Sequence, residues 1–178
     1  MPIPGFREST YISKFILAAF ISSMFSCHEG EMKKTERPGE PDIFSVNDDD
    51  KEMNEAINKA KITLAEFDLA LDDSLSQKTS FAIKVKFETK RTTEHIWFTE
   101  IKKEDGNYSG VLSNVPSHIE GIKLGERRKF KRSATSDWMY EDQCELRGGY
   151  TIRLLRRRMS QAEREKFDAE FELEIKDP

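Results

Sequence analysis

A group of aromatic, polar and glycine residues in the second half of the chain has the composition of a binding surface. Aromatic rings beside a carboxylate, an imidazole and a guanidinium commonly line a groove that holds a ligand or a partner side chain. We predict a binding surface built from His95, Trp97, Asn114, Asp137, Trp138, Tyr140, Gly149, Tyr150 and Arg153.

These residues also have structural interpretations, which stay open at this point. Large aromatic side chains usually pack in a core, and Asp137 could instead accept backbone hydrogen bonds in a tight turn. Gly148 and Gly149 permit positive φ, which suits a sharp strand-to-helix turn as well as the close approach of a ligand. The catalytic alternative is an enzyme of unknown reaction, with Asp137 as acid or base, that uses the region of Asp137, Trp138, Gly149 and Arg153.

A geometric expectation accompanies the predicted surface. A hairpin returns its end beside its start, so we expect Asp137 and Trp138 to lie near the Gly148–Gly149 pair. The helix leaving that point carries Arg153 about one turn on. Asp137 and Arg153 are therefore predicted to pair, which would lower the Asp137 pKa.

The spaced motifs of metal and nucleotide chemistry are missing from the sequence. It contains no His-Glu-x-x-His, no Cys-x-x-Cys, no phosphate-binding Gly-rich loop and no Gly-x-Ser-x-Gly nucleophile turn. We therefore assign no catalytic residue and no metal ligand, and we expect no cofactor.

Cys27 stands at the end of an apolar run from Phe15 to Phe25, which is too short to cross a bilayer as a helix. Arg7 and Lys14 precede the run, as in a secretory signal, and Ser26 before Cys27 resembles a bacterial lipobox. We predict a lipoprotein signal peptide over residues 1–26 and lipidation of Cys27. The alternatives are an ordinary cleaved signal, an uncleaved anchor and a misplaced start codon.

The composition limits the classes of function. Among 178 residues 35% are charged and 37% hydrophobic, and twelve Phe can still build a core. The net charge of −4 and a pI near 5.6 argue against a nucleic-acid partner. Charge is segregated, since residues 47–75 are acidic while residues 121–132 and 147–166 are basic. The simplest expectation is that these segments pair with each other.

Hydrophobic periodicity predicts the elements that must position the candidate residues. Residues 27–46 are predicted to be a flexible tether, followed by a single domain over residues 47–178. An apolar stripe from Met53 to Leu71 predicts one amphipathic helix. Period-two alternation predicts strands over 81–88, 94–103 (with His95, Trp97, Thr99 and Ile101 on one face), 108–113 and 127–135, and a hairpin around Asp142 and Gln143.

The end of the chain is predicted to be helical again. Apolar residues at helical spacing follow Gly149, and the sequence from Ser160 to Glu163 has the form of a capping box. The order of elements indicates an α+β fold: an N-terminal amphipathic helix packed on an antiparallel sheet of about 4–6 strands, with short C-terminal helices.

Several blocks of the chain resemble a bacterial family. They are Ala60–Thr63, Glu94–Trp97, Tyr108–Asn114, Leu124–Glu126, Asp137–Tyr140, Gly148–Arg153, Arg158–Ser160 and Phe167–Asp168. In this order they resemble domain of unknown function 2314 over most of the residues after the signal. The resemblance implies a domain and no activity. It also implies Gly where this chain has Cys144, which puts a tight two-residue turn there in doubt.

Together these observations predict an exported, lipid-anchored protein of the cell envelope, facing the periplasm or the exterior. Its domain is expected to be non-catalytic and to bind an unknown protein or envelope ligand. Besides the enzyme described above, the other alternative is an immunity-type module that neutralises a toxin by protein–protein binding.

Overall fold

The computed structural model describes residues 33–37, 40–45, 50–75, 77–89, 93–116, 119, 121–171 and 173–176. The predicted signal peptide and Cys27 lie outside these ranges. Within the segment predicted as a tether, β1 (Lys33–Arg37) and β2 (Glu40–Ser45) form a separate two-stranded antiparallel sheet. The tethering role of that segment stays a prediction.

A six-stranded antiparallel sheet is the centre of the domain, in the order β6-β5-β4-β3-β7-β8. Its strands are β3 (Thr79–Glu88), β4 (Thr93–Glu104), β5 (Asn107–Leu112), β6 (Arg127–Phe130), β7 (Thr135–Asp142) and β8 (Glu145–Gly148). The short 3-10 helix η1 (Arg132–Ala134) separates β6 from β7. The predicted strand over 127–135 is therefore wrong in length, because the chain turns at η1 and its last residue already belongs to β7.

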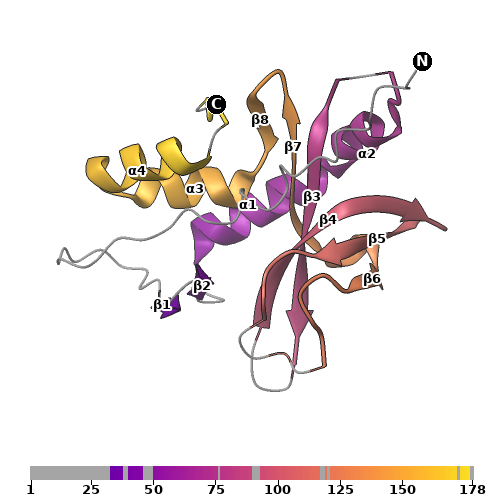
Figure 1. Cartoon of the computed structure of the whole chain (residues 1–178), viewed down its shortest axis with the longest axis horizontal. Coiled ribbons are helices and arrows are strands. Elements are labelled where there is room, and N and C mark those ends of the chain that lie inside the picture. Colours follow the sequence, from indigo (N-terminus) through magenta and orange to yellow (C-terminus); the bar gives the residue numbers. More distant parts are fainter. Residues whose placement is uncertain are drawn as a thin grey trace, which may run out of the picture.

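In the described residues four α-helices accompany this sheet: α1 (Lys51–Ile62), α2 (Leu64–Asp72), α3 (Tyr150–Arg158) and α4 (Gln161–Phe171). Figure 1 shows α3 and α4 on the β8 side of the sheet, away from β5 and β6. At the start of α4 the Glu163 side chain accepts from the Ser160 amide, and the Ser160 hydroxyl accepts from the Glu163 amide. The predicted capping box and the predicted α+β class are thus confirmed.

The predicted single N-terminal helix is broken at Thr63. Its amide keeps the regular helical bond to the Lys59 carbonyl at 3.0 Å, and its hydroxyl donates to the same carbonyl at 2.8 Å. The Ala60 carbonyl, which would meet the Leu64 amide in a continuous helix, accepts instead from the Trp138 indole at 2.9 Å. The break therefore has a tertiary cause in β7, which no local pattern reveals.

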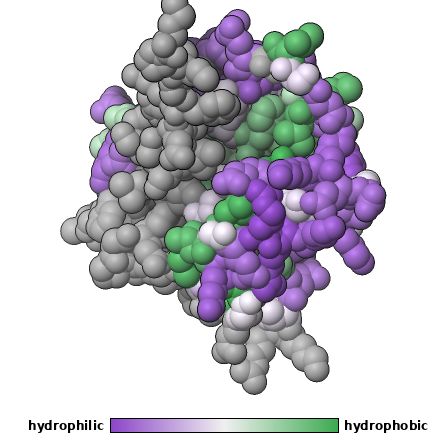
Figure 2. Space-filling model, turned by 45° about the vertical axis from the view of Figure 1, so that its right-hand side comes forward, coloured by the Kyte–Doolittle hydropathy of each residue, from purple (hydrophilic) through white to green (hydrophobic). Residues whose placement is uncertain are grey.

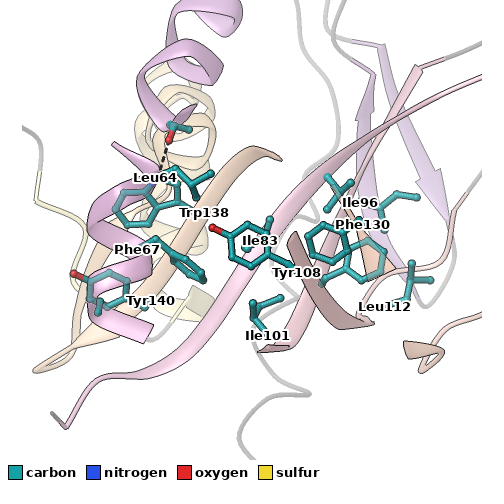
Figure 3. Packing of buried hydrophobic residues seen from close by; sticks show 14 of the residues in the cluster. Leu64, Phe67, Ile83, Ile96, Ile101, Tyr108, Leu112, Phe130, Trp138 and Tyr140 are labelled. Atoms are coloured by element: carbon teal, nitrogen blue, oxygen red, sulfur yellow. Dashed lines mark hydrogen bonds between the residues drawn. The ribbon is translucent and has the colours of Figure 1, made fainter. Parts of the chain in front are cut away.

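The main core lies between α1–α2 and one face of the sheet, called here the helix face. Its largest buried side chains include Phe67, Phe98, Tyr108 and Trp138. Figure 3 shows Leu64 and Phe67 from α2 meeting Trp138 and Tyr140, with Ile83 and Tyr108 extending the cluster toward β4, β5 and β6. The prediction that Leu64 and Phe67 are buried is confirmed, since they are 2% and 0% exposed.

The side of the sheet on which alternate β4 side chains lie changes along the strand. The alternation predicted Ile101 on the same face as His95 and Trp97, but Ile101 belongs to the main core together with Ile96. Glu100 has a φ of 48°, and the pairing with β5 shifts register between Thr99 and Lys102. This bulge moves Ile101 to the helix face, so the prediction was wrong at that residue.

The acidic and basic segments pair across elements, as the charge pattern predicts. Asp68 and Asp72 on α2 contact Arg132 and Lys103 at 2.7 and 2.6 Å. Asp50, at the start of α1, contacts Arg158 at 2.6 Å, and this hydrogen bond lowers the pKa of the Asp50 carboxyl. On the face drawn in Figure 2 the described residues are largely hydrophilic, and the hydrophobic groups lie in separate areas.

The β7–β8 hairpin turns in two residues. Asp142 pairs with Glu145, and between them Gln143 and Cys144 have φ values of 53° and 64°. Positive φ at both central residues is the pattern of a type I′ turn, which ordinarily favours Asn-Gly. The doubt that Cys144 raised about a tight turn is therefore not upheld, because the turn forms with a strained non-glycine residue.

We expect Cys144→Gly to stabilise the protein by about 0.5–1 kcal/mol. Glycine removes the left-handed strain, and the greater freedom of the unfolded chain offsets part of that gain. Thermal unfolding measures the effect, with Cys144→Ser as the control that removes the thiol but keeps the strain. A lower melting temperature for the glycine variant than for the serine variant would contradict this account.

Candidate functional site

Two consecutive glycines direct the chain from β8 into α3. Gly148 and Gly149 have φ values of 69° and 64°. A Cβ at Gly148 would lie 2.3 Å from the Trp138 carbonyl oxygen, and one at Gly149 would lie 2.8 Å from Leu146 Cδ2. The close approach is to the protein's own backbone and core, so the structural interpretation of the glycine pair accounts for both residues.

Asp137 caps the helix that follows. Its carboxylate is 0% exposed. Oδ1 accepts from the amides of Trp138 at 2.9 Å and Tyr150 at 3.1 Å. Oδ2 accepts from the Thr151 amide at 2.9 Å and the Thr151 hydroxyl at 2.5 Å. A carboxylate on β7 thus satisfies free amides in the first turn of α3, where the Gly149 N-cap has no side chain to do so.

This arrangement disfavours Asp137 as an acid or base. Burial raises the pKa of the Asp137 carboxyl, while Lys84 and the hydrogen-bond donors oppose that rise. Four donors occupy the acceptor positions of the two oxygens, which is the geometry of an ionised carboxylate with no position left for a reacting proton. Asp137 therefore serves the fold in the way the tight-turn interpretation describes.

Arg153 has a separate structural role. It donates to the carbonyls of Gly148 at 2.8 Å and Leu146 at 2.6 Å, and also to that of Lys176. Within the described part of the chain, the hydrogen bonds accepted by the Asp137 carboxylate come from Trp138, Tyr150 and Thr151. The two groups do lie at the same corner, but the predicted Asp137–Arg153 pair is not formed.

Three of the predicted aromatic residues belong to the main core or its margin. Trp138 is 1% exposed and stacks on Tyr140, with ring centroids 5.9 Å apart. The half-buried Tyr150 packs edge to face on Trp138, with ring centroids 5.8 Å apart. Core packing therefore accounts for Trp138 and Tyr140, and Tyr150 sits at the edge of the same cluster.

His95 and Trp97 lie on the opposite side of the sheet, called here the second face. Trp97 pairs across the strands with Lys84, and Lys84 pairs in turn with Asp137, so the three form a row over β4, β3 and β7. The Lys84 ammonium lies 4.8 Å from the centroid of the Trp97 ring and donates to the Thr151 hydroxyl at 2.7 Å. Burial lowers the pKa of Lys84, and the charge of Asp137 opposes that shift.

His95 lies on β4 two residues before Trp97, and its ring is oriented by Ser136. The Ser136 hydroxyl donates to the Lys84 carbonyl, so it accepts the proton of His95 Nδ1 at 2.8 Å. In that tautomer of the neutral ring, Nε2 carries a lone pair that can accept a hydrogen bond. Burial and the neighbouring lysines 84, 86 and 61 lower the pKa of His95 to about 4, so the imidazole is neutral at pH 7.

Asn114 positions the loop after β5 against the start of β4. Its side-chain oxygen accepts from the Trp97 amide at 2.8 Å, and Ser113 donates to the Trp97 carbonyl. The Trp97 ring is half-buried and packs against a smaller cluster made of Leu146, Ile152, Phe171, Leu173 and Ile175. Asn114 is therefore hydrogen-bonded to the backbone of Trp97, and Trp97 shares the second face with His95.

The sequence did not single out Lys84, Ser136 or Thr151. Lys84 was one polar residue among several on an alternating strand, where the default expectation is a solvated side chain. Its environment depends on the register that places it between Trp97 and Asp137. No local pattern reports that register, so no signal in the sequence could have identified the row.

The described residues were also searched for two other features. They contain no group of three or more His, Cys, Asp or Glu side chains that could hold a metal ion. None of the helices in these ranges is both long and apolar enough to cross a membrane.

Comparisons with known proteins identify relatives but no activity. The family model described as "Uncharacterized protein conserved in bacteria (DUF2314)" matches residues 50–175. The chain is 32% identical over 104 residues to the uncharacterized protein YegJ of Escherichia coli, covering 58% of this chain and 67% of that one. It is 29% identical over 148 residues to a putative ankyrin repeat protein of Neisseria meningitidis, covering 79% of this chain and 58% of that one.

No solved structure matches the chain. The family match spans the six-stranded sheet and the helices α1 to α4. The chain therefore belongs to the bacterial DUF2314 family of uncharacterized proteins.

Proposed function

We propose that this protein is exported, anchored by lipid at Cys27, and binds a protein or envelope ligand through the second face of its domain without catalysing a reaction. The anchor is inferred from the apolar run that ends at Cys27. The binding role rests on one observation: the half-buried Trp97 ring lies beside Lys84 and His95 on the second face.

The second face has the mixed character of a binding surface. The Trp97 ring supplies an apolar contact, Lys84 a hydrogen-bond donor, and His95 a neutral imidazole whose Nε2 has no hydrogen-bond partner among the described residues. The loop held by Asn114 adjoins the same part of the face. Loops beside a rigid sheet are common places for binding residues.

The proposed enzyme alternative loses the residue on which it depended. With its four acceptor positions filled, Asp137 has no free lone pair with which to act as a base. An immunity-type role would use the same second face and would differ in the partner alone.

We expect Cys27→Ser to release the protein from membranes into a soluble fraction. The reason is that a serine cannot receive the thioether-linked lipid. Cell fractionation followed by immunoblotting measures the distribution, with Cys144→Ser as a control that should stay membrane-bound like the wild type. Full retention of the Cys27→Ser protein with residues 1–26 still attached would show an uncleaved anchor instead of a lipid.

Binding can be located by placing a photoreactive amino acid at Trp97 and, as the matched control, at Leu69. Leu69 is 73% exposed on α2, away from the second face. Irradiation of intact cells should give a discrete crosslinked product from position 97 and none from position 69. Equal products from both positions, or none from position 97, would count against the second face as the binding surface.

A further inference from the structure

We propose that the open edge of β6 is a docking site for an acidic, extended segment of a partner protein, which adds to the sheet as a further strand. The site goes beyond the proposed function, because β6 lies two strands away from Trp97 on β4. Unpaired backbone groups, basic side chains and an exposed leucine come together along this edge.

The two edges of the six-stranded sheet differ in how their backbone groups are satisfied. At the β8 edge the Leu146 amide donates to the Glu174 carbonyl at 3.0 Å, and the Glu174 amide donates to the Cys144 carbonyl at 2.8 Å. That edge is therefore covered by the end of the chain. At the opposite end of the sheet (Figure 1), β6 pairs with β5 alone, and no other described strand pairs with its outer side.

The register of β6 identifies the backbone groups that face the open edge. The Leu112 amide donates to the Glu126 carbonyl at 3.0 Å, so the hydrogen bonds to β5 continue at every second residue, next at Arg128. In an antiparallel ladder the residues between direct their N–H and C=O groups away from the partner strand. Arg127 and Lys129 therefore present both donors and acceptors to the open edge.

Charge determines which strand can add to this edge. The basic residues on β6 or flanking it are Lys123, Arg127, Arg128, Lys129 and Lys131. Glu100, Glu126 and Glu104 pair with the three basic residues inside the strand. Among the described residues Lys123 and Lys131 have no ion pair, so the edge keeps an excess of positive charge. Like charges disfavour pairing with the same edge of a second copy, whereas a strand that carries carboxylates is favoured.

The direction of the β6 side chains indicates the spacing of those carboxylates. Phe130 packs in the main core on the helix face, so alternation places the side chains of Arg127 and Lys129 on the second face. In an antiparallel partner strand the residues that bond to Arg127 and Lys129 lie directly opposite them, with side chains on the same face. The ligand is therefore a segment with acidic residues at every second position.

An exposed leucine adjoins the start of β6. Leu124 is 58% exposed, and the Glu126 amide donates to the Lys123 carbonyl across it at 3.0 Å. Gly125 has a φ of 78°, as at the third position of a type II turn, and its amide donates to the Leu112 carbonyl at 2.9 Å. The turn is thus fixed to β5 and holds Leu124 at the surface, where an apolar residue of the partner segment can contact it.

The test measures binding of a fluorescein-labelled peptide of alternating Thr and Glu to the purified protein by fluorescence anisotropy. Two modified peptides carry N-methyl groups on all the Glu residues or on all the Thr residues. We expect methylation at Glu to weaken binding about tenfold or more, because it removes the donors that face β6, while methylation at Thr leaves binding nearly unchanged. Equal affinities of the two methylated peptides, or no binding of the unmodified peptide, would overturn the proposal.

Lys129→Glu tests the selection by charge at a side chain that is 76% exposed. We expect it to weaken binding of the Glu peptide several-fold and to strengthen binding of a matching Lys peptide. Lys51→Glu, the same charge change at the exposed start of α1, should alter neither affinity. If both affinities stay unchanged in Lys129→Glu, the acidic preference is wrong.

Sedimentation with phosphatidylglycerol vesicles separates a protein partner from a membrane surface. Binding of the protein to these vesicles without binding to the peptide would overturn the proposal in favour of a lipid surface. None of these measurements involves Cys27 or Trp97, so their failure is distinct from failure of the proposed function.

Discussion

Replacing Asp137 by Asn is expected to lower the free energy of unfolding by about 3–5 kcal/mol, the usual cost of breaking a buried charged interaction. The amide has one acceptor oxygen, so its NH2 group must face one of the two donor pairs. On the Oδ1 side those donors are two backbone amides, and on the Oδ2 side they are the amide and hydroxyl of Thr151. Either orientation leaves a buried donor unsatisfied.

The same change also removes a negative charge that has two favourable contacts. It lies at the N-terminus of α3, where the helix dipole favours an anion, and it offsets the charge on Lys84. Asp137→Asn should therefore cost less in a Lys84→Met background than alone, because the two residues are coupled.

Urea unfolding followed by tryptophan fluorescence measures the loss, with Asp142→Asn as the matched control. Asp142 is on the same strand, half-buried at the turn, and meets Arg147 at 3.6 Å, so its contribution is expected to stay within about 1 kcal/mol. If Asp137→Asn shifts the midpoint no more than Asp142→Asn does, Asp137 is not the structural cap described here, and its role in binding would have to be reconsidered.

Local patterns predicted the elements whose causes are local. The apolar stripe located Leu64 and Phe67 on the buried side of the N-terminal helices, and Ser160 with Glu163 marked the start of α4. Alternation located β3, with Ile83 and Val85 in the core. In each case the evidence lies within a few residues of the feature that it predicts.

The features that were missed have causes distant in the sequence. The break at Thr63 depends on an indole from β7, and the reversal of Ile101 depends on a bulge against β5. The residues of the predicted binding surface lie on two different faces of the sheet for the same reason. Composition could not tell that Asp137 and Trp138 point to opposite faces of a central strand, or that Lys84 completes a row with Trp97.

The second large effect is expected from Phe67→Ala, which should destabilise the protein by about 3–5 kcal/mol. Phe67 is 0% exposed and packs among rings from three strands. Its centroid lies 5.6 Å from that of Phe81, 6.3 Å from that of Tyr108 and 5.8 Å from that of Trp138. Truncation would leave a cavity between α2 and the helix face, where both backbones limit how far the walls can collapse.

Leu69→Ala is the matched control for that variant. Leu69 lies two residues along the same helix and is 73% exposed, so its truncation is expected to change stability by no more than about 0.5 kcal/mol. Comparing the urea midpoints of the two variants separates core packing from helix propensity, because both end in alanine on α2. A Phe67→Ala midpoint no lower than that of Leu69→Ala would contradict the packing of α2 on the sheet. Phe67 also touches Trp138, whose indole donates to the Ala60 carbonyl, so the same result would contradict the tertiary origin of the break at Thr63.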